Sequence, residues 1–123
     1  MDVVLNEVAF EHARRLIRLG RYVADERDDW SEHRPSVEEE NQYLVDHDLE
    51  DYGKWYLGIN REARHDIKAK FELPYGDFEN VHRCGVLLAE SRAAEYGRRD
   101  IEAAAHELHE MIDERRRGRR AHP

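Results

Sequence analysis

Cysteine, proline and glycine are scarce in this sequence, and it has no long hydrophobic run. The single cysteine, Cys84, cannot form a disulfide within the chain, so nothing in the sequence points to an oxidising compartment. Seven glycines and three prolines are too few for a linker-rich or collagen-like chain. No stretch approaches the roughly 18 apolar residues of a membrane-spanning helix, and the acidic start of the chain is unlike the cationic start of a signal peptide. We therefore expect a cytoplasmic protein without membrane attachment.

Charged residues are abundant instead. They make up 39% of the 123 residues, and the net charge is −8. This length predicts one domain with a modest core, and the charge load predicts helices with one apolar stripe under a charged surface. An acidic body should be repelled by nucleic acid, so only the basic end of the chain could bind a polyanion. That end holds Arg115, Arg116, Arg117, Arg119 and Arg120, which could instead complement the negative end of a helix dipole.

Hydrophobic periodicity and capping signals predict helices over most of the chain. The first spans about residues 5–20, with Gly20 as its C-cap. Ser36 begins another, because the segment SVEE fits a capping box. The strongest helix covers 78–96, and the last covers 101–116 with an apolar stripe at helical spacing. Since only about four residues join these two helices, they should form an antiparallel hairpin.

The densest aromatic segment, LEDYGKWYLGIN, is interrupted by two glycines and predicts a short, imperfect helix that ends near Gly58. Trp30 is expected to anchor a loop on the core. Taken together, these segments predict an all-α, single-domain bundle of four to five helices over residues 1–114, with a C-terminal antiparallel helical hairpin. A basic, flexible tail is expected over 115–123.

The segment VHRCGVLLAESRA raises the question of an active site around Cys84. A cysteine nucleophile needs a base within hydrogen-bond reach, but side chains two residues apart on a helix point roughly 200° apart. His82 therefore cannot activate Cys84 if the predicted helix is continuous. Cys84 shares a helix face with Val81 and Leu88, which predicts an inert, buried thiol. Because no catalytic motif occurs elsewhere, we expect no catalytic residues.

A carboxylate metal site is the alternative source of chemistry. The Glu-x-x-His spacing of di-metal carboxylate bundles occurs twice, and the candidate ligands are Glu62, His65, Glu79, His82 and Glu90. On the predicted 78–96 helix the last three point away from the apolar face, and therefore to water. His106 and His109 also lie close on a helix, but they do not match the HExxH pattern of zinc proteases. We therefore expect no metal and no cofactor.

Six short words occur in this order: DDWSEH, KWYLGI, PYGDF, VHRCG, ESRA and MID. Over residues 8–113 the chain resembles a family of small, uncharacterised bacterial proteins. That resemblance implies no activity that can be assigned to particular residues. From KWYLGIN to MID the chain is also similar to a short helical segment of tailed-phage head-assembly polypeptides. This second resemblance implies a role in assembly or protein contact.

The leading hypothesis is a non-catalytic protein–protein interaction or assembly module that self-associates. It is based on the lack of catalytic motifs, on the aromatic segment and on small residues along the helix faces. The partner would be a protein or a second copy, and the contact surface would comprise Trp30, Tyr52, Trp55 and Tyr56. The alternative is a small metal- or ligand-binding helical protein that uses the five candidate ligands. Nucleic acid would bind only through the arginine tail.

Overall fold

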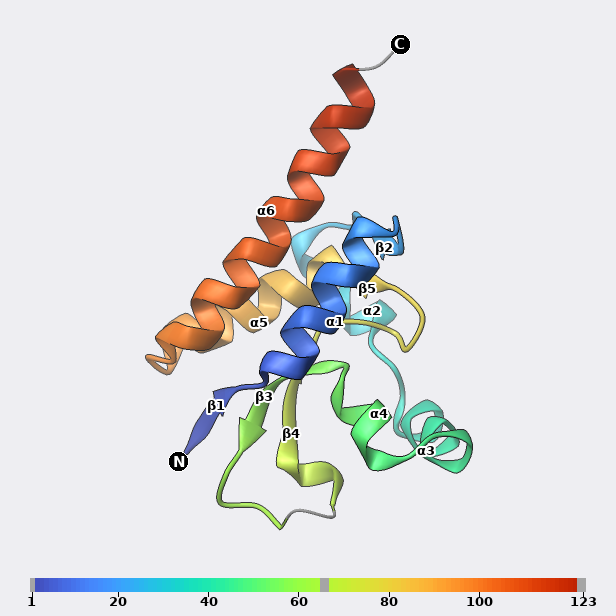
Figure 1. The fold of residues 1–123 in the computed structure, drawn as a ribbon, viewed down its shortest axis with the longest axis vertical. Helices are drawn as coiled ribbons and strands as arrows, with labels where there is room; N and C mark the ends of the chain where they lie inside the picture. The colour runs from blue at the N-terminus through green and yellow to red at the C-terminus, as the bar shows by residue number, and fades with distance from the viewer. Residues whose placement is uncertain (1, 65–66, 122–123) are drawn as a thin grey trace.

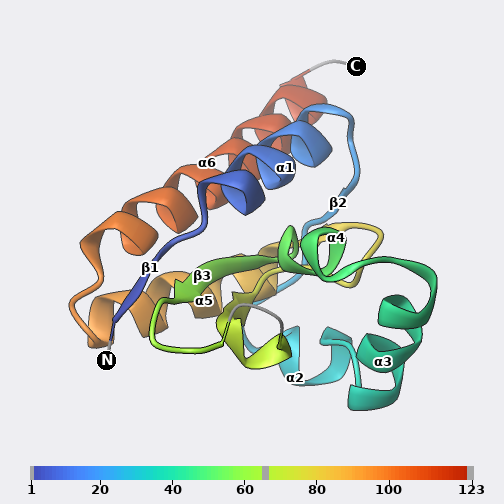
Figure 2. The same ribbon diagram turned by 60° about the horizontal axis from the view of Figure 1, so that its bottom comes forward.

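The computed structural model describes residues 2–64 and 67–121, with the backbone alone for 119–121. In these ranges the chain forms helices and two small sheets, so the prediction of an all-α bundle is wrong and the fold is α+β (Figures 1 and 2). The helices are α1 (Glu7–Arg18), α2 (Trp30–His33), α3 (Val37–Asp46), α4 (Leu49–Gly53), α5 (Arg83–Glu95) and α6 (Arg99–Ala121). The strands are β1 (Val3–Leu5), β2 (Tyr22–Val23), β3 (Tyr56–Asn60), β4 (Phe71–Pro74) and β5 (Val81–His82).

The larger sheet has the strand order β1-β3-β4, and both of its pairings are antiparallel. Its middle strand, β3, begins with three buried residues, Tyr56, Leu57 and Gly58, so it lacks the alternation of a half-buried strand. Periodicity cannot distinguish such a short buried run from a helix. The predicted helix ending near Gly58 is therefore wrong, because α4 ends at Gly53 and a strand follows.

The helix predicted over 78–96 begins five residues later, at Arg83. Asp77 does not cap a helix. Its Oδ1 accepts hydrogen bonds from the backbone N–H groups of Glu79 and Asn80, which closes a turn. Phe78 has a φ of 71°, in the left-handed region, which a helix cannot include. The smaller sheet, a parallel pairing of β2 with β5, then places His82 on a strand directly before the helix.

Local signals predicted three helices correctly. The buried face of α1 is Ala9, Ala13, Leu16 and Ile17, as its period requires. Both hydrogen bonds of the predicted capping box are present at the start of α3, between Ser36 and Glu39. In α6 the apolar stripe is buried, with Met111 only partly so. This helix does not end at 116 but continues to Ala121, so the expected flexible tail is helical that far.

The core lies where α1, α5 and α6 meet the larger sheet (Figure 1). The turn between α5 and α6 contains Gly97 at a φ of 71°, and the two helices pack together as the predicted hairpin. Trp30, Tyr52, Trp55 and Tyr56 are each at most 5% exposed. These four side chains are therefore almost wholly covered by the rest of the chain and do not form an exposed interaction surface.

Replacement of Gly76 by alanine tests the packing of the loop before β5. A Cβ atom there would lie 2.6 Å from the Asn80 carbonyl oxygen and 2.8 Å from the Trp55 ring. Because backbone cannot yield as a flexible side chain can, we expect a loss of about 1–3 kcal/mol in the free energy of unfolding, measured by urea denaturation. Gly118→Ala is the control, since nothing lies within 4 Å of its Cβ position. Equal stability of both variants would contradict this packing.

Candidate functional site

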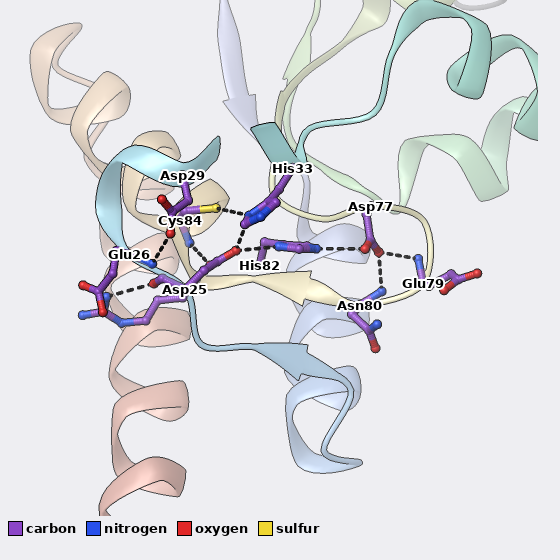
Figure 3. A network of polar contacts seen from close by, with 10 residues as sticks. Asp25, Glu26, Asp29, His33, Asp77, Glu79, Asn80, His82 and Cys84 are labelled. Atoms are coloured by element: carbon purple, nitrogen blue, oxygen red, sulfur yellow. Dashed lines mark hydrogen bonds and ion pairs between the residues drawn. The ribbon is translucent and has the colours of Figure 1, made fainter. Parts of the chain in front are cut away.

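A buried polar cluster joins four segments that are distant in the sequence (Figure 3). Asp25 follows β2, His33 ends α2, His82 ends β5, and Cys84 lies in the first turn of α5. Asp25 Oδ2 lies 2.8 Å from His33 Nδ1 and 2.7 Å from His82 Nδ1. Cys84 Sγ lies 3.8 Å from His33 Nδ1. We call these four residues the Asp25 cluster.

The parallel pairing of β2 with β5 brings two members of the Asp25 cluster together. Val23 lies opposite His82, so the residues two positions further along each segment, Asp25 and Cys84, come side by side. The Cys84 amide donates to Asp25 Oδ1 at 2.8 Å. His82, the N-cap residue of α5, makes no capping bond with its own side chain. Asp25 therefore satisfies an unpaired N–H of the first turn from a remote position.

His82 lies between two carboxylates and is only 6% exposed. Its Nδ1 faces Asp25 Oδ2, and its Nε2 lies 2.8 Å from Asp77 Oδ2. The other oxygen of Asp77 is held by the N–H groups of Glu79 and Asn80. Figure 3 shows this chain of contacts running from Asp25 through the imidazole to Asp77. The ring is therefore fixed at both nitrogens.

The two carboxylates decide the ionisation of His82. Burial alone would lower the pKa of His82, but hydrogen bonds to Asp77 and Asp25 raise it. Burial would likewise raise the pKa of Asp77, but hydrogen bonds from His82 and from the Asn80 and Glu79 amides lower it to about 2. The pKa of Asp25 is lowered as well, because the bonds from His82 and the Cys84 amide outweigh its burial. These shifts favour an imidazolium between two carboxylates.

A Cys–His–Asp set could in principle supply a nucleophile, a base and an orienting acid. In such a relay the acid and the nucleophile contact different nitrogens of the imidazole. Here Asp25 Oδ2 and Cys84 Sγ both contact Nδ1 of His33. Cys84 is also fully buried, and burial together with Asp25 raises the pKa of its thiol. The geometry is therefore that of side chains converging on one point, which does not suit nucleophilic catalysis.

The prediction that Cys84 is buried is confirmed, although Leu88, expected on the same helix face, is 37% exposed. Cys84 lies in the first turn of α5, where Gly85 lets the Trp30 ring approach to 3.0 Å from its Cβ position. Gly85 therefore packs against a side chain of α2 and against the Tyr75 backbone carbonyl, whose oxygen is also 3.0 Å from that position.

The candidate ligands of the alternative hypothesis that the structure describes, Glu62, Glu79, His82 and Glu90, are not brought together in one cluster. His65 lies outside the described residues. Glu62 and Glu79 are exposed and belong to no metal-ligating cluster of the described chain. His82 is buried, so the expectation that it points to water is wrong. Glu90 lies in a second cluster, away from His82.

This second cluster bridges α5 and α6. The two oxygens of Glu90 lie 2.6 Å from His109 Nδ1 and 3.1 Å from His106 Nδ1. His109 Nε2 is 3.3 Å from a Glu110 oxygen. His106 is largely exposed, so these contacts lie on the surface of the hairpin.

The arginines considered as a polyanion-binding tail extend along α6. The Arg115 guanidinium lies 6.0 Å from the centre of the Tyr22 ring, and Arg116 lies 4.0 Å from an Asp113 oxygen. Arg117 is exposed, and the side chains of Arg119 and Arg120 are outside the described part. Binding of a polyanion by this segment stays a prediction.

Comparisons with protein-family models, curated proteins and solved structures found no match to the chain. The resemblance to a bacterial family and to phage head-assembly proteins therefore stays a prediction. In the described residues, no helix combines the length and the apolar character that crossing a membrane requires.

Asp77→Asn tests the charge of the network around His82. Asparagine keeps the turn acceptor for Glu79 and Asn80 but removes the ion pair. The lowered pKa of Asp77 stabilises the fold at pH values above the ordinary carboxylate pKa, and this stabilisation is lost as the pH falls toward about 2. The raised pKa of His82 stabilises the fold below about pH 6.5, and this stabilisation is lost as the pH rises through the pKa of the folded state. We expect the variant to be less stable by about 1 kcal/mol between about pH 4 and 6.5, and by less outside that window.

The measurement is the free energy of unfolding of both proteins across this pH range, with a chelator present. A stability difference that does not change with pH would show that Asp77 acts only as a turn residue.

Proposed function

We propose that the protein binds a divalent transition metal ion, with zinc as the best match, at the Asp25 cluster. The observation that carries this proposal is the convergence of one donor atom from each of the four side chains, all within 4.8 Å of one another. Two imidazoles, a thiolate and a carboxylate form a ligand set that zinc takes in four-coordinate sites. Magnesium and calcium prefer oxygen ligands alone, so this donor set does not suit them.

Asp77 supports the proposal from outside the cluster. Histidine ligands usually donate their second ring N–H to a carboxylate, which fixes the tautomer and the ring orientation. His82 has this arrangement, since its Nε2 meets Asp77 while its Nδ1 faces the cluster. With Nε2–H donating to Asp77, a neutral His82 directs the Nδ1 lone pair at the Asp25 carboxylate. That repulsion is relieved by a proton or by a metal ion.

The charges balance in both states. Without metal, the imidazolium of His82 offsets the carboxylate of Asp25, and the thiol of Cys84 is neutral. With a divalent ion, the carboxylate and a thiolate offset the metal while both histidines are neutral. The ion thus replaces two protons, one from His82 and one from Cys84, and the site carries no net charge in either state. An unbalanced buried charge would be costly.

The role best supported is structural. Four protein ligands fill a tetrahedral zinc site and leave no open position for water or substrate. Three of them, Asp25, His82 and Cys84, are buried, and the fourth, His33, is the ligand on the four-residue helix α2. Metal at this point would fasten α2 to the start of α5. Because the unfolded chain has no such site, binding would stabilise the folded state.

Cobalt(II) gives a direct test because thiolate and tetrahedral coordination change its spectrum. Titration of the metal-free protein with Co²⁺ should give a sulfur-to-cobalt charge-transfer band and intense visible bands that saturate at one ion per chain. Cys84→Ser should remove the charge-transfer band. Asp77→Asn alters only the outer partner of His82, so it should weaken binding about tenfold or more while keeping the band.

The control is the double variant His106→Gln with His109→Gln, which removes the histidines of the second cluster. It should bind Co²⁺ with the same spectrum and stoichiometry as the unaltered protein. A spectrum without sulfur coordination, or one lost in this control variant and kept in Cys84→Ser, would contradict the proposal.

A further inference from the structure

An apolar groove of about 310 Å³ lies between β4 and α5. Trp30, Leu73, Pro74 and Leu88 contribute its apolar lining. Trp30 is fixed as the floor, because its ring packs against the space that Gly85 leaves on α5. Leu88 is 37% exposed. The groove therefore offers apolar surface on a rigid base.

Three arginines line the same groove, Arg34, Arg92 and Arg98, with a single acid, Glu72. In the described part of the chain, the guanidinium groups of Arg34 and Arg92 have no ion pair or hydrogen bond, and that of Arg98 meets only the Val3 carbonyl and the Tyr96 ring. The chain has 28 acidic residues against 20 Lys and Arg, so acids to pair them are not scarce. Unpaired arginines beside apolar surface match a ligand that carries carboxylates and apolar groups.

The backbone of β4 does not favour strand addition. This strand is at the edge of the sheet, but Pro74 lacks an N–H donor and Leu73 has a φ of 63°, outside extended geometry. Recognition in the groove would therefore depend on side chains, through the arginines and the apolar floor.

We propose that this groove binds an acidic, partly apolar peptide segment of a partner protein. Carboxylates of the segment would pair with Arg34 and Arg92, and an apolar side chain would cover Leu88 over the Trp30 floor. The net charge of −8 does not oppose this, because charges are screened beyond about 8 Å at physiological salt and the groove residues act within that range. None of the lining residues is itself a ligand of the Asp25 cluster, and the proposal does not require a bound metal ion.

Selection of random eight-residue peptides displayed on phage against the full-length protein tests the proposal. Enriched sequences should combine Asp or Glu with Leu, Phe or another large apolar residue. A fluorescein-labelled synthetic peptide of the enriched sequence should then bind Arg92→Glu at least about tenfold more weakly than the unaltered protein, since reversal of the charge replaces an attraction with a repulsion. Leu88→Ser should also weaken binding about tenfold, without changing charge.

Arg99→Glu is the matched control, because Arg99 is exposed on the same hairpin and lies outside the groove. It should bind the peptide as the unaltered protein does. The proposal is overturned if the enriched sequences are not acidic, or if Arg92→Glu and Leu88→Ser bind as tightly as the control. Sedimentation showing that a second copy of the chain occupies the groove, through a dimer lost in Arg92→Glu, would also overturn it.

Discussion

The hydrogen bonds of the Asp25 carboxylate are the interactions on which the Asp25 cluster and the elements around it depend. One of its oxygens accepts from the Cys84 amide at the start of α5, and the other meets the imidazoles of His33 and His82. A buried carboxylate is costly unless it is paired and hydrogen-bonded, so each of these groups stabilises the position of the others. Through them Asp25 fastens α2, β5 and α5 to the loop after β2. A metal ion bound at the Asp25 cluster would link the same segments and hold them together more strongly.

Local sequence signals were sufficient to predict the helices whose caps or apolar periods lie within one segment. The capping box at Ser36, the period of α1 and the stripe of α6 lie each within one segment, so they could be read from the sequence. The strands could not be predicted from such local signals. β3 is short and its first three residues are all buried, and β5 has two residues that pair with β2 from 59 positions away. A left-handed Phe78 stops the helical period before α5, and nothing in the pattern of apolar residues announces it.

The same distinction applies to the candidate site. His82 and Cys84 were recognisable from the sequence, but a continuous helix would have turned their side chains apart, and the strand-to-helix junction between them removes that objection. Asp25 and His33 had no detectable spacing, since they approach Cys84 from 59 and 51 residues away. Contacts of this range follow from the pairing of β2 with β5. The second cluster, by contrast, lies on a hairpin that was predicted, and there the two histidines could be placed together in advance.

X-ray absorption spectroscopy of the zinc-loaded protein is the most direct test of the proposed metal site, because it counts the ligand atoms around the metal itself. We expect four-coordinate zinc with one sulfur at about 2.3 Å and three nitrogen or oxygen atoms at about 2.0–2.2 Å. The sulfur can come only from Cys84, the one cysteine of the chain, if the two methionines do not ligate. Zinc surrounded by nitrogen and oxygen atoms alone would contradict the proposed site and leave Asp25 and His82 as an ion pair.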